Sequence, residues 1–257
     1  VPDHASVWYF IREITAEGIV ENFNTLDRVA QGASMMTDTG MSKRVIGAAW
    51  PRHFNRPIAE AMDRNIQAIG LPTWSEDDQR FAKALQALMG DEEGPGLATE
   101  LTPIGEPSDI LRSGGSDDIG DISWVTPTVT LRYPSNISGL QGHHWSSAMT
   151  MATPIAHKGA VAGAKVVATT MLDMVQNPSL VDSAKDYFEN VQTEEVQYEP
   201  FIGPDDAPAI EKNAEIMAQY KDQLRQYYYD PERYDSYLEQ LGIDYPQLEP
   251  PEITRNQ

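Results

Sequence analysis

The chain has 257 residues, no cysteine, and a formal net charge of −20 from 39 acidic and 19 basic side chains. A chain of this length can bury the core of one or two domains, and the lack of cysteine excludes a disulfide framework or a thiolate metal site. The charge argues against nucleic acid and membrane partners, because phosphate binding requires clustered Lys and Arg. With no apolar run long enough to span a bilayer, we expect a cytoplasmic protein.

Residues 1–52 have the pattern of a β-α-β unit. Residues 5–12 are rich in aromatic and β-branched side chains, which favours a strand. A helix capped near Thr15 should follow, with apolar residues at alternating steps of four and three. Residues 42–50 then predict a second strand.

Two helices and a long loop are predicted next. Apolar residues between 58 and 69 form one helical stripe, and Ser-Glu-Asp-Asp at residues 75–78 is a capping box for a helix that ends at Gly90. Residues 91–115 are rich in Gly, Pro and acidic side chains without a period, which predicts a loop. Residues 91–121 contain 9 acidic side chains and only one Arg, so a bound cation would offset the repulsion between the acidic side chains.

The second half begins with a predicted strand at residues 124–133. Residues 154–176 predict an Ala-rich helix whose small residues would let it pack closely on a sheet, and Asn177-Pro178 starts a further helix. Residues 201–257 are acidic and rich in tyrosine, with two predicted helices. Their aromatic face would pack either on the body of the same chain or on a second subunit.

The pattern with the most chemical content is GGSDDIGDISW at residues 114–124, followed about twenty residues later by GHHW at residues 142–145. Asp117, Asp118 and Asp121 lie among glycines, which allow close approach to a bound group, and two imidazoles follow. Oxygen and nitrogen ligands of this kind suit zinc, manganese or cobalt better than calcium. The two segments predict part of a metal site.

Several motifs occur in the order found in the C-terminal half of the M20 metallopeptidase and amidohydrolase family. Family segments similar to VPDxAxVWYxxR, GSTDVGDVSW, PTV, GHSW and HKG have counterparts here at residues 1–12, 115–124, 127–129, 142–145 and 157–159. The chain therefore resembles this family from residue 1 to about residue 200. It is most similar to the branch of the aminobenzoyl-glutamate hydrolase B subunits.

The resemblance implies an α/β fold. Residues 1–52 would be the trailing β-α-β half of a ferredoxin-like lid or dimerisation domain. Residues 53–200 would be the C-terminal part of a zinc-peptidase-like catalytic domain, a mixed sheet flanked by helices. Residues 201–257 would form a helical extension.

The resemblance also implies hydrolysis of N-acyl amino acids or dipeptide-like amides, such as aminobenzoyl-glutamate, with two divalent metal ions, zinc or manganese. His143 takes the place of the last metal ligand, and His144 stands where the family has serine. His144, Asp118 and Asp121 would bind the metal or orient its ligands, although the two aspartates could instead cap turns. Donors to a substrate carboxylate would come from Gly115 and Ser116. Because the chain is acidic, positive groups, either Arg112 or residues of the missing half, would have to collect an anionic substrate.

Two features of the family are missing from this sequence. Members carry an N-terminal segment with a His-x-x-Gly-His-like motif and a Glu-Glu pair, which supply most metal ligands and the general base. The five histidines here lack that spacing, and the pairs Glu92-Glu93 and Glu194-Glu195 lie in polar surroundings. We therefore expect the general base outside this chain, in an N-terminal half or a companion chain, and a homo- or hetero-oligomeric enzyme.

The alternative is a non-catalytic subunit or degenerate relative that acts as a binding protein. Of the histidines outside the GHHW motif, we expect His53 and His4 at the surface and His157 as a packing or capping residue. Asn55 is expected to form a turn.

Overall fold

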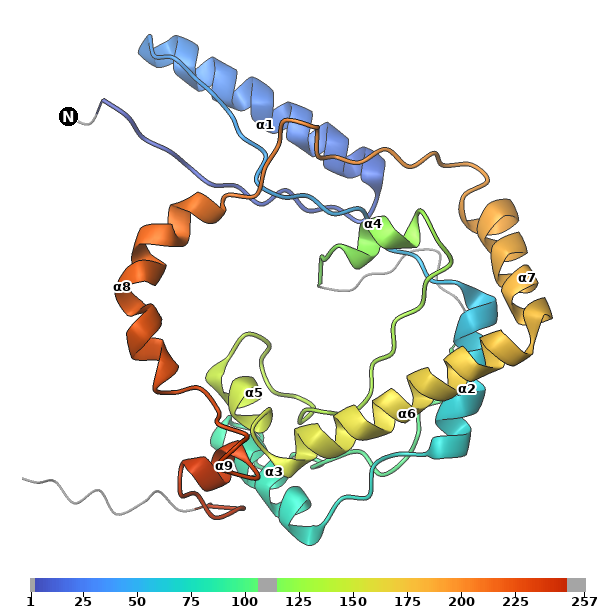
Figure 1. The fold of residues 1–257 in the computed structure, drawn as a ribbon. Coiled ribbons are helices and arrows are strands. Elements are labelled where there is room, and N and C mark those ends of the chain that lie inside the picture. The colour runs from blue at the N-terminus through green and yellow to red at the C-terminus, as the bar shows by residue number, and fades with distance from the viewer. Residues whose placement is uncertain (1–2, 106–114, 249–257) are drawn as a thin grey trace, which may run out of the picture. The chain divides into compact units, whose positions relative to one another are not determined.

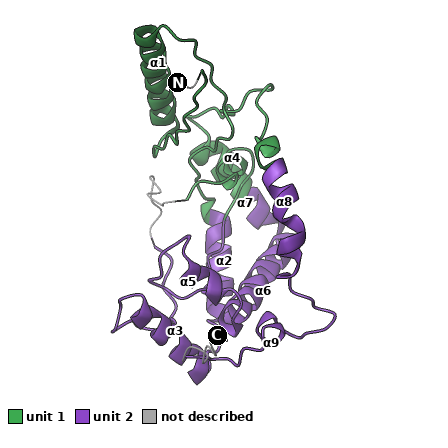
Figure 2. Cartoon of the chain, turned by 90° about the vertical axis from the view of Figure 1, so that its left-hand side faces the viewer, with its two compact units in different colours: residues 1–56, 106–129, 184–214 green, residues 57–105, 130–183, 215–257 purple. Residues whose placement is uncertain are grey.

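A computed structural model describes residues 3–105 and 115–248 (Figure 1). The chain forms two compact units, each assembled from three segments (Figure 2). Unit 1 contains residues 1–56, 106–129 and 184–214, and unit 2 contains residues 57–105, 130–183 and 215–257. The division into domains at residues 52 and 200 stays a prediction.

The expected mixed sheet is wrong, because the regular structure of the described residues consists of helices and contains no strand. Residues 5–12 and 42–50 have no regular secondary structure, and Trp124 and Val125 lie in a turn. High β-propensity means that a sequence fits a pleated, half-buried surface, and the backbone becomes a strand only when a neighbouring strand satisfies its N–H and C=O groups. Without that neighbour, the side chains of residues 7–10 are between 61% and 85% exposed.

Unit 1 begins with α1 (Ala16–Thr37), whose N-terminus confirms the predicted cap: Thr15 Oγ1 accepts a hydrogen bond from Gly18 N. The helix ends at Asp38, which adopts the left-handed conformation. No residue of α1 is buried. Unit 1 also contains the short helices α4 (Ile119–Ser123), η1 (Phe188–Gln192, a π-helix) and η2 (Ile210–Asn213).

Unit 2 contains three helices of 13 to 23 residues, α2 (Arg56–Ile69), α3 (Glu76–Leu88) and α6 (Pro154–Gln176), and two short ones, α5 (Trp145–Thr150) and α9 (Tyr237–Gln240). Two more helices are α7 (Pro178–Tyr187) and α8 (Ala214–Arg225), and both of them, like α2 at Arg56, cross a boundary between the units. None of the helices among the described residues has the length and apolar character that crossing a bilayer requires.

The core of unit 2 lies around α3. The capping box predicted at Ser75 is present, with reciprocal hydrogen bonds between Ser75 and Asp78. The apolar face that follows is buried together with residues from a loop, a turn and α6; the cluster consists of Phe81, Ala82, Leu85, Leu97, Ile137 and Ile155. Capping and periodicity therefore predicted the start of α3 and its buried residues Phe81 and Leu85, whereas Leu88 of the same apolar stripe is 69% exposed.

The helix α6 begins and ends as predicted, but it does not pack on a sheet. A Cβ atom at Gly159 would lie 2.1 Å from Pro134 O, so glycine lets the helix touch the backbone of an irregular segment. Gly163 similarly approaches Tyr133. The small residues allow the close packing that the sequence suggested, against a different partner.

Candidate functional site

The acidic motif of unit 1 is joined to the segment at residues 50–53. Asp121, on α4, accepts a hydrogen bond from Trp50 N at 3.2 Å with one carboxylate oxygen and from Tyr198 OH at 2.9 Å with the other. Burial, together with the hydrogen bond to Asp121, raises the pKa of Tyr198 to about 12. Both oxygens of Asp121 therefore have protein donors, and this carboxylate ties three distant segments together.

The neighbours of Asp121 contact the same segment. A Cβ atom on Gly120 would lie 1.9 Å from Trp50 O, so this position requires glycine. Ser123 Oγ donates to Gly120 O at 2.6 Å and accepts from His53 N at 3.3 Å. Trp124 Nε1 donates to Pro51 O at 2.7 Å. The side chains of Asp121, Ser123 and Trp124 thus form their hydrogen bonds within the protein.

Trp50 is the centre of an aromatic cluster that we define as Trp50, Trp124, Tyr198 and Phe201. The centroid of its ring lies 5.1 Å from each of the other three rings. Trp50 is only 7% exposed, and its indole N–H donates to Glu199 O at 2.7 Å. Such edge-on and stacked pairs stabilise a core beyond the area that they bury.

His53 lies beside this cluster and is not the surface residue that the sequence suggested. Its ring centroid is 4.3 Å from that of Trp124, and its Nε2 is buried without a hydrogen-bond partner among the described residues. Burial lowers the pKa of His53 to about 4, so the ring is neutral near pH 7. The sequence neighbours of His53, an arginine and a phenylalanine, do not indicate that its ring is buried against an aromatic cluster.

Two amide side chains fix the tautomer of His53. Asn55 is fully buried and does not simply form a turn: its Nδ2 donates to Ala184 O and to Gln192 Oε1, both at 2.9 Å. Because the oxygen of Gln192 accepts from Asn55, its amide nitrogen faces His53 Nδ1 and donates to it. The ring hydrogen must then sit on Nε2.

The other predicted residues of the acidic motif are exposed. Gly115 and Ser116 lie at the surface, with Arg52 as the closest side chain to Gly115. Arg52 Nη1 lies 3.5 Å from Asp117 Oδ2. Asp118 precedes α4, but its side chain does not cap the helix. The predicted substrate contact of Arg112 lies outside the described residues.

The two histidines of the GHHW motif belong to unit 2 and differ from each other. His144 is the N-cap of α5, and its Nδ1 accepts from Ser146 N at 3.3 Å and lies 2.8 Å from Ser146 Oγ. His143 is exposed and has φ 56°; among the described residues other than glycine, only Asp38 shares a positive φ. His144 therefore uses one ring nitrogen locally, while the ring of His143 is open to an external group.

The described residues of this chain do not complete a metal centre. No group of three or more His, Asp or Glu side chains that could hold one ion occurs among residues 3–105 and 115–248. A zinc site requires at least three protein ligands, and a neutral imidazole with an accessible nitrogen is a suitable one. His143 meets that requirement for a single ligand, so the residues present fit a contribution to a metal site and not a whole one.

Comparison with known proteins gives one informative match. No family model matches the chain, and no solved structure matches it. The chain is 26% identical over 215 residues to the B subunit of p-aminobenzoyl-glutamate hydrolase from Escherichia coli strain K12. The match covers 74% of this chain and 44% of that protein, so the chain spans less than half the length of its relative. The resemblance drawn from the sequence motifs is thereby confirmed, and the chain is a distant, partial relative of a hydrolase subunit.

Proposed function

We propose that this chain supplies part of the active site of a metal-dependent amide hydrolase. The substrates are N-acyl amino acids or dipeptide-like amides such as aminobenzoyl-glutamate, and the cofactor is a pair of zinc or manganese ions. A companion polypeptide supplies the general base and the remaining ligands. The observation that carries the proposal is the match to a hydrolase subunit along 74% of the chain.

His143 is the residue to which we assign a metal ligand. Its left-handed backbone, at φ 56°, costs about 1–2 kcal/mol for a residue other than glycine. Strain of this kind is retained where the resulting direction of a side chain is useful. The exposed ring can present a nitrogen lone pair to an ion held mainly by another polypeptide. A bound metal would polarise the amide carbonyl and lower the pKa of its water.

His144 fills a different role in this proposal. When its Nδ1 accepts from Ser146 N, the neutral ring carries its hydrogen on Nε2. A nitrogen that carries hydrogen cannot ligate a metal, but it can donate a hydrogen bond to a carbonyl or carboxylate oxygen. We therefore assign His144 to substrate orientation.

The acidic motif divides into two parts in the same way. Asp121 has donors on both oxygens and acts by holding residues 50–53 in place. Asp118, Gly115 and Ser116 are exposed and remain accessible to a substrate or a metal ligand. We assign to Gly115 and Ser116 the donors that bind a substrate carboxylate.

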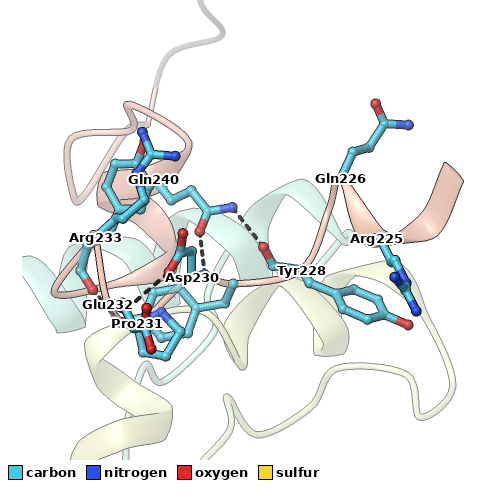
Figure 3. A pocket seen from close by; sticks show the side chains of 10 residues that line it. Arg225, Gln226, Tyr228, Asp230, Pro231, Glu232, Arg233 and Gln240 are labelled. Atoms are coloured by element: carbon cyan, nitrogen blue, oxygen red, sulfur yellow. Dashed lines mark hydrogen bonds between the residues drawn. The ribbon is translucent and has the colours of Figure 1, made fainter. Parts of the chain in front are cut away.

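A non-catalytic binding role is the second candidate, and the tyrosine-rich tail favours it. In unit 2, residues 225–240 surround an open pocket of about 490 Å³ (Figure 3). Gln240 closes part of its wall by accepting from Asp230 N at 2.8 Å and donating to Tyr228 O at 3.0 Å. Tyr227 and Tyr228 are more than 60% exposed beside it, and amphipathic tyrosine is enriched at interfaces.

Reconstitution with a companion polypeptide tests the first proposal. The chain is co-expressed with the portion of the E. coli relative that lies outside the matched region, and the release of p-aminobenzoate from p-aminobenzoyl-glutamate is measured together with bound zinc and manganese. His143→Ala should lower the rate at least about 100-fold and remove metal. His157→Ala, which changes another exposed imidazole of unit 2, is the matched control and should do neither.

Three results would count against the proposal. These are no hydrolysis by the assembled pair, hydrolysis without bound metal, or equal activity of the His143→Ala and wild-type chains. The last of these would also remove the assignment of His143 as a ligand.

A further inference from the structure

The helix α6 is apolar on two opposite faces. One face packs within unit 2 and buries Ile155, Ala156, Gly159, Gly163, Val166 and Thr170. A surface helix normally carries charged and polar side chains on the face opposite its buried stripe. The second face of α6 does not follow this rule.

The second face is an unbroken apolar stripe with alternating steps of three and four residues. We define the α6 outer face as Val161, Ala164, Ala168, Met171 and Val175, all of which are exposed. The exposed fractions of Val161, Met171 and Val175 are 56%, 61% and 79%, and exposed Leu172 lies beside them. A stripe with this spacing presents one continuous surface along several turns.

One exposed charge, Lys165, lies along this surface, four residues after Val161 and three before Ala168. Between Gly159 and Gln176 the helix carries only Lys165 and Asp173. Asp173 accepts a hydrogen bond at 2.7 Å from Asn65 of α2, so it is committed to the interior of unit 2. A helix with apolar stripes on two opposite faces is expected to be covered on both of them.

We propose that the α6 outer face is the docking surface for the companion polypeptide, namely the portion of the hydrolase relative that has no counterpart in this chain. This inference rests on the proposed function. The relative is more than twice as long as the part that matches, so more than half of it has no counterpart in this chain. A second copy of this chain fits the surface poorly, because two molecules of charge −20 repel each other.

Two exposed helix ends of unit 2 provide a matched test. Val175 is the penultimate residue of α6 and Leu88 is the last residue of α3; they are 79% and 69% exposed. A glutamate at either position meets a similar helix terminus and a similar solvent environment. Val175→Glu therefore tests the docking surface, and Leu88→Glu controls for the added charge.

The test is co-purification of the full chain with the unmatched portion of the E. coli relative, co-expressed and quantified after size-exclusion chromatography. We expect a one-to-one complex. Met171→Glu and Val175→Glu should each reduce its yield about tenfold or more, because each places a charge in an apolar interface. Leu88→Glu should change the yield less than about twofold. Amide hydrogen exchange of α6 should slow in the complex, and circular dichroism of each variant reports whether the chain has folded.

Other outcomes overturn the inference. If no complex forms, the companion is not the occupant. If the chain alone is dimeric and both α6 variants make it monomeric, a second copy is the occupant. If the α6 variants and Leu88→Glu behave alike in properly folded chains, the face is not an interface. A complex that forms through α6 without hydrolysing the amide supports the docking surface and contradicts the proposed function. An active pair that both α6 variants leave unaffected supports the proposed function and contradicts the docking surface.

Discussion

Unit 2 has an apolar core, whereas unit 1 depends on polar and aromatic contacts between distant segments. In unit 2 an apolar face of α3 is buried in a cluster of six residues. In unit 1 the long helix α1 buries no residue, and Asp121 joins segments 71 and 77 positions away in the sequence. The structure of unit 2 therefore follows largely from local helical periodicity, whereas that of unit 1 follows from contacts between residues far apart in the sequence.

The largest predicted effect is on the pairing in unit 1. Gly120→Ala places a Cβ atom 1.9 Å from Trp50 O, so α4 must move away from residues 50–53. We expect a loss of about 3 kcal/mol in the stability of unit 1. Hydrogen exchange read by mass spectrometry should show loss of protection at residues 50–55 and 119–124, while α3 keeps its protection.

Gly47→Ala is the control for this substitution, because a Cβ atom there meets nothing within 4 Å. Simultaneous loss of protection in α3 and α4 would mean that the two units unfold together. It would contradict the view that they are stabilised in different ways.

The equivalent test in unit 2 is Asp78→Ala. Asp78 is fully buried and accepts hydrogen bonds from Ser75 N, Lys158 Nζ and Tyr245 OH. Its removal leaves these donors without an acceptor, and we expect a loss of about 2–3 kcal/mol in urea unfolding. Asp77→Ala, at an exposed neighbour that pairs with Arg80, should cost less than about 1 kcal/mol. Equal losses of stability in the two variants would show that the buried hydrogen bonds of Asp78 do not stabilise unit 2 more than an exposed ion pair does.

Acidification should weaken unit 1 before unit 2. Burial lowers the pKa of His53 from 6.5 to about 4, so the unfolded state binds a proton at a higher pH than the folded state. Stability is therefore fully present above pH 6.5 and falls between pH 6.5 and about 4. Because the ring is only partly buried, we expect a loss of about 1–2 kcal/mol. His53→Phe should remove this dependence, as measured by unfolding across that range.

Asp78 responds in a lower range of pH. Burial opposes its ionisation, but hydrogen bonds from Lys158, Ser75 and Tyr245 outweigh that effect and lower its pKa below 3.8. Its contribution to unit 2 is therefore lost only as the pH falls below that value. Loss of protection in α3 at about pH 5 would contradict this order of unfolding.

The smallest expected effect belongs to the surface of unit 1. Lys43 forms an ion pair with Asp27 of α1 and lies 4.6 Å from the centre of the Phe23 ring. Lys43→Met keeps an apolar chain over the ring and removes only the charge. Exposed ion pairs contribute little, so we expect a change below about 0.5 kcal/mol in urea unfolding. A larger loss would show that α1 is anchored electrostatically.

The helices were predictable because their determinants are local. The cap at Thr15, the capping box at Ser75 and the start of α6 at Pro154 each depend on residues within one turn. The three predicted strands were wrong because a strand requires a partner that local sequence cannot supply. Residues 7–10 show the consequence, since they are apolar and exposed and form no strand.

The candidate site was predictable only in part. The motifs located Asp121 and the GHHW segment, and the structure adds what their neighbours do. The environment of His53 could not be read from the sequence, because Gln192 lies 139 positions away. Only the folded chain brings that amide to the ring, where Asn55 donates a hydrogen bond to the oxygen of the same amide.

The amide of Gln192 determines which ring nitrogen of the buried His53 carries the hydrogen. A carboxylate in its place, as in Gln192→Glu, would accept the ring hydrogen on Nδ1 and expose a lone pair on Nε2. Nε2 of the same histidine would then be a hydrogen-bond acceptor, whereas it is now a donor. A single exchange of nitrogen for oxygen, in a helix of five residues, would be enough to reverse that choice.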